Sequence, residues 1–159
     1  KGKPVYLYGA PGNERLTKFG GEKQAMKKRI LIVEDNLLHT RLIEMTLRAK
    51  NYTLLKATDG EEALDIATRE RPDLILMDLN LPEMTGFEVI KKLREKPAFR
   101  HTPIIAITAY AMKEDRERLI ESGCDAYLTK PINTRELPRI IAEMLLQGEK
   151  SSVEQQRGW

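Results

Sequence analysis

Acidic side chains follow two short apolar segments of this sequence. Glu34 and Asp35 come directly after the run RILIV, and Asp78 comes directly after the run LILM. Neighbouring carboxylates repel one another and raise each other's pKa unless a cation joins them. Magnesium suits such a group, because it prefers oxygen ligands, needs only one or two carboxylates and usually shares its coordination sphere with a phosphoryl oxygen. The three acids therefore predict a magnesium site.

Two more polar residues follow apolar segments later in the chain. Thr108 ends the run PIIAIT with a hydroxyl group, and Lys130 lies just beyond the run AYL with an ammonium group. A metal, a hydroxyl and an ammonium around an aspartate are the groups that neutralise charge on a phosphoryl group during its transfer. Asp78 would then be the nucleophile and form an aspartyl phosphate.

The elements that must position these residues alternate along the chain. Apolar runs at residues 29–33, 52–57, 74–77, 103–107 and 126–128 predict five short strands, and a segment of helical periodicity follows each of them. Short strands buried on both faces indicate a parallel sheet that is covered by helices on each side. The carboxyl ends of parallel strands share one edge, which is where ligands bind in such sheets. We therefore expect the polar residues above to converge.

The chain divides into three parts by composition. Residues 28–147 contain all the predicted elements and fit one domain of ordinary size. Residues 1–27 form an N-terminal extension or linker, of which the first 25 are rich in Gly, Lys and Pro. We interpret those 25 as an upstream remnant, a cloning tail or an over-long gene start. Residues 148–159 are expected to be a polar C-terminal tail.

Charge and hydrophobicity limit the partners and the compartment. Residues 1–28 carry seven Lys/Arg against two Asp/Glu, a net charge of +5, so the rest of the chain carries −2. The predicted domain is therefore slightly acidic, and nucleic-acid binding is not expected. The segment after the last predicted helix is also too short for a helix-turn-helix unit. No stretch approaches the roughly 20 apolar residues of a membrane span. One cysteine, Cys124, suits a reducing compartment, and we expect a cytoplasmic protein without membrane association.

These motifs resemble the receiver domain of two-component response regulators over about residues 28–147. The resemblance is carried by Glu34-Asp35, Asp78, Thr108 and Lys130-Pro131 in the family's order. The stretches ILIVEDN, PDLILMDLNLPEMTGFEV and GCDAYLTKPI are most similar to single-domain receivers of the DivK and CheY kind and to receivers attached to hybrid kinases. The resemblance implies a flavodoxin-like, doubly wound α/β fold with a five-stranded parallel sheet in the order 2-1-3-4-5.

The resemblance also implies roles for the acidic residues. Asp78 matches the phosphoacceptor, which takes its phosphoryl group from a phosphohistidine of a sensor histidine kinase or a histidine phosphotransfer protein. Asp35 and Asp78 would bind Mg²⁺ directly, Asn80 through its backbone carbonyl and Glu34 through water. Asn80 and Tyr110 occupy positions whose side chains tune dephosphorylation in the family.

The remaining implied roles concern phosphate binding and switching. Lys130 and Ala109 match phosphate-binding positions, and the family commonly has a cis peptide before the residue that matches Pro131. Thr108 and Tyr127 match the switch pair, in which the hydroxyl moves toward the phosphoryl group and the aromatic ring turns inward. The face built from the fourth helix, fifth strand and fifth helix would then change for a downstream protein target. Receivers of this type can also pair through that face as homodimers.

Three alternatives stay open. The chain could be a receiver fragment of a hybrid histidine kinase, or a pseudo-receiver that keeps the fold without phosphorylation. A magnesium-dependent phosphohydrolase of the haloacid dehalogenase type is disfavoured, because Asn80 lies where such enzymes carry a second aspartate and an amide cannot act as the acid or base. We therefore expect a signalling protein rather than an enzyme, apart from its own phosphotransfer and slow autodephosphorylation.

Histidine and cysteine chemistry is not predicted. His39 lies in the segment LLHTRL without the glutamate and proline pattern that surrounds a kinase's phosphorylated histidine. We assign it a surface or packing role, and we expect His101 to be exposed in a loop. Cys124 is interpreted as a small core residue.

Overall fold

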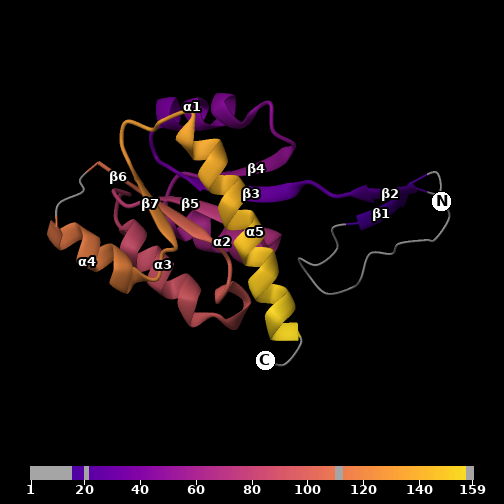
Figure 1. Cartoon of the computed structure of the whole chain (residues 1–159). Coiled ribbons are helices and arrows are strands. Elements are labelled where there is room, and N and C mark those ends of the chain that lie inside the picture. Colours follow the sequence, from indigo (N-terminus) through magenta and orange to yellow (C-terminus); the bar gives the residue numbers. More distant parts are fainter. Residues whose placement is uncertain (1–15, 20–21, 110–112, 157–159) are drawn as a thin grey trace.

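The central element is a parallel β-sheet whose strands alternate with helices (Figure 1). The structure is a computed structural model that describes residues 16–19, 22–109 and 113–156. The sheet contains β3 (Lys28–Val33), β4 (Tyr52–Ala57), β5 (Leu74–Asp78), β6 (Ile104–Thr108) and β7 (Ala126–Thr129). Their spatial order is β4-β3-β5-β6-β7 and every pair is parallel. Counted along the chain, this order is 2-1-3-4-5, which confirms the predicted fold.

Within the described residues, five α-helices and one short 3-10 helix lie between or after these strands. They are α1 (Leu37–Leu47), α2 (Gly60–Glu70), α3 (Gly86–Glu95), η1 (Pro97–Phe99), α4 (Lys113–Ser122) and α5 (Glu136–Gln156). Successive strand side chains point to opposite faces of a sheet. In β3, Leu31 and Val33 join the core with α2, α3 and α4, whereas Ile30 and Ile32 join the core with α1 and α5. The helices therefore cover both faces, as the uniformly apolar strands predicted.

Side-chain caps fix where the helices nearest the carboxyl edge of the sheet begin. The side chain of Asn36 accepts hydrogen bonds from the backbone N–H groups of Leu38 and His39, and Thr85 accepts one from Glu88. Such caps satisfy N–H groups that have no partner within the helix. The Asn36 cap lets α1 start within a few residues of the end of β3, which holds the intervening acids at the edge of the sheet. The Thr85 cap fixes the start of α3 after a longer loop.

A guanidinium group ties together the loops at the opposite edge of the sheet. Arg94, near the end of α3, donates to the carbonyl oxygens of Phe99 at 2.6 Å, Thr102 at 2.7 Å and Gly123 at 3.0 Å. It also pairs with Asp125 at 2.8 Å. The same Asp125 oxygen accepts the first backbone N–H of β6, from Ile104, at 2.8 Å. We call this group the Arg94 cluster.

The segment before the sheet contains structure that the sequence analysis did not predict. β1 (Leu16–Phe19) and β2 (Glu22–Ala25) pair antiparallel as a separate two-stranded sheet. The sequence analysis interpreted this segment as a linker because it has no sustained apolar period. A backbone ladder between two short strands requires no such period. The signal that was available is the Gly20-Gly21 pair in the sequence between the two strands, which is typical of a hairpin.

The last helix also extends further than predicted. The predicted domain ended at residue 147, whereas α5 continues to Gln156. Gly148 lies against Pro103, and a Cβ atom at position 148 would be only 3.0 Å from the proline ring. Lys28 pairs with Glu149 at 2.5 Å. Gly148 therefore permits close packing within the helix instead of ending it.

None of the helices in the described part of the chain is both long and apolar enough to cross a membrane.

Candidate functional site

The sheet brings the predicted site residues to one edge. Beyond the ends of the strands, the N–H of Glu34 donates to Ala57, that of Leu79 to Ile107 and that of Lys130 to Thr108, at 2.8 to 3.0 Å. These bonds extend the pairing of the strands past their regular ends. The side chains at strand ends are therefore held by the sheet itself rather than by mobile loops.

Three carboxylates lie together at this edge. Glu34, Asp35 and Asp78 each offer one oxygen, and these oxygens lie within 4.8 Å of one another. Glu34 and Asp78 are buried, whereas Asp35 is exposed. The group therefore offers oxygen ligands and is open to water on the side of Asp35. This suits a hard divalent ion that keeps part of its water shell. The residues present therefore fit a magnesium ion.

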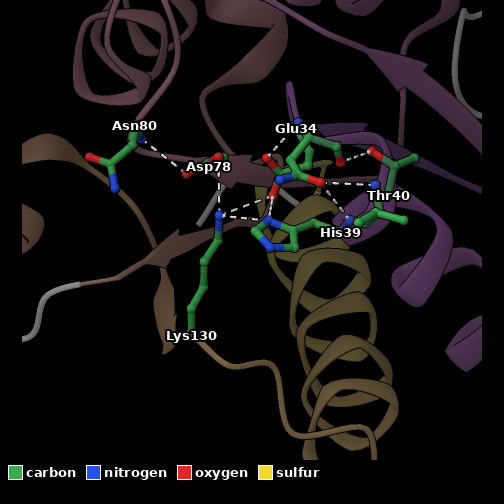
Figure 2. Close-up of polar contacts among 8 residues, drawn as sticks. Glu34, His39, Thr40, Asp78, Asn80 and Lys130 are labelled. Carbon is green, nitrogen blue, oxygen red and sulfur yellow. Dashed lines mark hydrogen bonds and ion pairs between the residues drawn. The ribbon is translucent and has the colours of Figure 1, made fainter.

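One ammonium group lies among these acids (Figure 2). Lys130 Nζ is 3.1 Å from Glu34 Oε1 and 3.3 Å from Asp78 Oδ2. Burial alone would lower the pKa of Lys130, but the two carboxylates outweigh it and raise that pKa overall. Burial, and then the neighbouring Asp78, raise the pKa of Glu34. A single lysine therefore neutralises only part of the acidic charge.

The imidazole of His39 also belongs to the site, and the sequence analysis missed it. His39 Nδ1 lies 3.2 Å from Glu34 Oε1 and 3.2 Å from Lys130 Nζ (Figure 2). The surface or packing role assigned from the sequence is therefore incomplete. The available signal was the Asn36 cap, which accepts the N–H of His39 and so places this residue in the first turn of α1, directly beside Glu34.

The loop after Asp78 turns back sharply against the strand. The N–H of Asn80 donates to Asp78 Oδ1 at 3.0 Å, and the N–H of Gly86 donates to the carbonyl of Leu79 at 3.1 Å. A Cβ atom at position 86 would lie 2.4 Å from the carbonyl oxygen of Asp78. Only glycine permits this approach. Glu83 in the same loop has a φ of 64°, a conformation that costs a residue with a side chain free energy.

The residues predicted for phosphate binding and switching lie at the ends of β6 and β7. Thr108 is buried and Ala109 is exposed, while Tyr127 is 37% exposed. Thr108 pairs with Thr129 across the sheet, directly before Lys130. The peptide bond between Lys130 and Pro131 is cis, the isomer that the resemblance implied. Tyr110, which was predicted to tune dephosphorylation, lies outside the described residues.

Comparison with known proteins gives a consistent result. Residues 30–142 match the response regulator receiver domain family. The polar-differentiation response regulator DivK of Brucella anthropi is 48% identical over 116 residues, which cover 73% of this chain and 92% of DivK. DivK of Brucella ovis is 47% identical over the same share of each chain.

Solved structures agree with the sequence comparison. The chemotaxis response regulator CheY4 of Vibrio cholerae has a TM-score of 0.71 and 31% identity, covering 75% of this chain and 99% of CheY4. The receiver domain of a sensor histidine kinase from Pseudomonas aeruginosa has a TM-score of 0.70 and 39% identity, covering 75% of this chain and 98% of that domain. That structure carries a magnesium ion coordinated in its active-site cleft. The chain therefore belongs to the response regulator receiver domain family, a signalling family rather than a class of classical enzymes.

Proposed function

We propose that the protein is a phosphorylation-dependent switch in which Asp78 accepts a phosphoryl group from a phosphohistidine. The donor would be a sensor histidine kinase or a histidine phosphotransfer protein in the cytoplasm. One observation carries the proposal: three acids offer oxygens within 4.8 Å of one another, and a lysine ammonium lies 3.3 Å from Asp78. A phosphoacceptor site needs this combination, because the transferred group carries negative charge that metal and ammonium must offset.

Four residues would hold the metal. We assign direct contacts to Asp35 and Asp78, a contact through the backbone carbonyl to Asn80 and a water-mediated contact to Glu34. Bound Mg²⁺ would neutralise charge on the phosphoryl oxygens. The magnesium ion in the related Pseudomonas aeruginosa receiver supports this assignment.

The residues of the chain would then act on the phosphoryl group as follows. A carboxylate oxygen of Asp78 attacks the phosphorus atom while the bond from phosphorus to the donor's imidazole nitrogen breaks. Lys130 moves from the carboxylates to a phosphoryl oxygen, and Thr108 and the backbone of Ala109 bind the other oxygens. Asp78 is buried, which limits the water that could hydrolyse the aspartyl phosphate.

The output would pass through a surface next to this edge. We propose that the Thr108 hydroxyl moves toward the phosphoryl group and that Tyr127, which is partly exposed in this structure, turns inward. The face formed by α4, β7 and α5 would then fit a downstream protein target or a second copy of the chain. The cis peptide before Pro131 lies directly after Lys130, between the phosphate site and α5.

One second candidate has specific support. The similarity to a receiver domain of a sensor histidine kinase favours the alternative that this chain is the receiver part of a hybrid kinase. In that case the phosphoryl group would come from a histidine of the same polypeptide or of its dimer partner. The chemistry at Asp78 would be unchanged, so the two candidates differ only in the origin of the donor.

The test is intact-mass spectrometry of the protein with Mg²⁺ and a small phosphodonor. Acetyl phosphate and phosphoimidazole should each add one phosphoryl group to the wild-type chain. No adduct is expected in a chelator or in Asp78→Asn, whose amide has almost the shape of the carboxylate but is a poor nucleophile. A wild-type chain that stays unmodified by both donors from milliseconds to hours would contradict the proposal and favour a pseudo-receiver.

A further inference from the structure

We propose that His39 is a positioning residue that holds Lys130 in its resting place on the acids and thereby lowers the affinity of the site for Mg²⁺. The inference rests on the proposed function, in which both the metal and Lys130 act on the phosphoryl group. It assigns a role to a side chain that the proposed chemistry does not otherwise use.

The first argument is the number of donors and acceptors. A lysine ammonium has three N–H donors and no acceptor. Lys130 Nζ has three acceptors in the described structure: Glu34 Oε1 at 3.1 Å, His39 Nδ1 at 3.2 Å and Asp78 Oδ2 at 3.3 Å. The acceptors come from the end of β3, the first turn of α1 and the end of β5. Figure 2 shows the terminal nitrogen of Lys130 joined to these acceptors by dashed lines.

The second argument is the tautomer that this contact requires. Nδ1 lies 3.2 Å from both Glu34 Oε1 and Lys130 Nζ, so an N–H there could donate to the carboxylate and a lone pair there could accept from the ammonium; we assign the lone pair. The ring proton then lies on Nε2. Glu34 Oε1, 3.2 Å from Nδ1, is a second acceptor of the same ammonium. The ammonium therefore contacts both atoms from one side and offsets the repulsion between the carboxylate oxygen and the Nδ1 lone pair.

The third argument concerns competition. Mg²⁺ and the Lys130 ammonium neutralise the same carboxylates, so Mg²⁺ binding requires the lysine to move away from them. A hydrogen bond from Lys130 to His39 that exists with the lysine in its resting place, and is lost when the lysine leaves the carboxylates, stabilises the metal-free state alone. By linkage, such a bond weakens Mg²⁺ binding. His39 thus raises the Mg²⁺ concentration at which the site becomes ready for phosphotransfer.

The experiment measures Mg²⁺ affinity by isothermal titration calorimetry, without any phosphodonor, on the full chain after chelator treatment. His39→Leu should bind Mg²⁺ about tenfold more tightly than the wild type, the size of effect expected when a hydrogen bond to a charged group is lost. His39→Asn should return the affinity to within about twofold of the wild type, because its amide oxygen can take the place of Nδ1. His39→Gln should behave like His39→Leu, because its amide reaches the position of Nε2 instead.

Two further variants separate this role from a general effect on α1. His101→Leu changes the other histidine of the chain, in an exposed loop, and should leave the affinity unchanged. In a Lys130→Met background, His39→Leu should have no effect, because the ammonium that His39 holds is gone. Nitrogen NMR of the wild type should show His39 with its proton on Nε2. Circular dichroism in chelator checks that every variant is folded.

The outcomes separate the two proposals. Unchanged or weaker Mg²⁺ binding in His39→Leu, or the same tightening in the Lys130→Met background, would overturn the role of His39. If the wild type still accepts a phosphoryl group on Asp78 in that case, the proposed function stands. A wild-type chain that neither binds Mg²⁺ nor accepts a phosphoryl group would overturn both.

Discussion

The two edges of the β-sheet each gather charged groups around one cation, and the two groups differ in balance. At the carboxyl edge, Lys130 is the cation among three carboxylates, Glu34, Asp35 and Asp78. At the opposite edge, the guanidinium of the Arg94 cluster meets one carboxylate, from Asp125, and several backbone carbonyls. The first group has excess negative charge and the second is neutral.

This difference separates a binding site from a structural contact. The donors of the Arg94 cluster are paired with acceptors inside the chain, so its interactions contribute to the stability of the fold and need no ligand. The acids at the other edge are only partly neutralised, and their mutual repulsion costs stability until a cation arrives. Sites that bind ligands are commonly less stable than the structure around them permits. We therefore expect substitutions at the two edges to change stability in opposite directions.

Arg94→Met should cause the largest effect and destabilise the protein by about 3 kcal/mol, because it leaves a carboxylate and several loop carbonyls without their donor. Urea unfolding measures this loss. Arg94→Lys should recover little of it, since an ammonium cannot reach the same set of acceptors as a planar guanidinium. Mg²⁺ affinity should stay within about twofold of the wild type. A large loss of Mg²⁺ binding in a folded Arg94→Met protein would break the comparison.

Glu34→Gln should have the opposite sign and stabilise the metal-free protein by about 1–2 kcal/mol at pH 8, since it removes one of two adjacent buried acids. Lys130 keeps Asp78 as its ionic partner in this variant. In saturating Mg²⁺ the gain should shrink or reverse, because the wild type then benefits from the metal that Glu34 helps to bind. Thermal unfolding with chelator and with Mg²⁺ gives both values. A loss of stability in chelator would contradict the expected repulsion.

The pH dependence provides the control for this variant. The pKa of Glu34 in the folded protein lies above its ordinary value of 4.5. The folded state then binds a proton more readily than the unfolded state, so this stabilisation is complete below pH 4.5 and is lost as the pH rises through the folded pKa. In chelator, Glu34→Gln should remove this component of the pH profile. If both proteins show the same pH dependence of stability, other groups cause it.

The smallest effects concern backbone conformation in the loops at each edge. Glu83 at the carboxyl edge has a φ of 64°, and Gly123 in the Arg94 cluster has a φ of 92°. Glu83→Gly should relieve strain and stabilise by up to about 1 kcal/mol, whereas Gly123→Ala should destabilise by about 1 kcal/mol or more. The added methyl at position 123 would also lie 3.2 Å from Arg94 Cγ. Urea unfolding measures both changes. If both substitutions destabilise the protein, the positive φ at Glu83 carries no strain and the two edges do not differ in this respect.

The fold was predictable because its strands are apolar on both faces and lie at regular intervals. The runs around Ile30 and Ile75 allow no other assignment than buried parallel strands, and strand-end acids then identify the functional edge. The β1–β2 hairpin and the end of α5 were not predictable from the same signals. The hairpin has no apolar period, and Gly148 is a helix breaker by propensity although it packs on Pro103 here.

The candidate site was predictable only at strand ends. Glu34, Asp35, Asp78 and Lys130 all follow apolar runs, which makes their convergence a consequence of topology. His39 lies on a helix, and its proximity to Lys130 depends on a contact between residues 91 positions apart. The Arg94 cluster was not predictable either. Most acceptors of Arg94 are backbone carbonyls, and these cannot be identified from residue types.

The close approach of Gly86 to Asp78 limits how the protein could respond to the proposed phosphorylation of Asp78. With 2.4 Å between the carbonyl oxygen of Asp78 and the place of a Cβ atom at position 86, the start of α3 packs directly against the backbone at the end of β5 and leaves no room for a side chain. If Asp78 is phosphorylated as proposed, a displacement that begins at its carboxylate would meet this packed backbone on the α3 side, and we expect it to be taken up on the side of Thr108 and Lys130. A side chain at position 86 would have to push these two backbones apart, so we expect substitutions that adjust the proposed switch to be tolerated elsewhere along the edge.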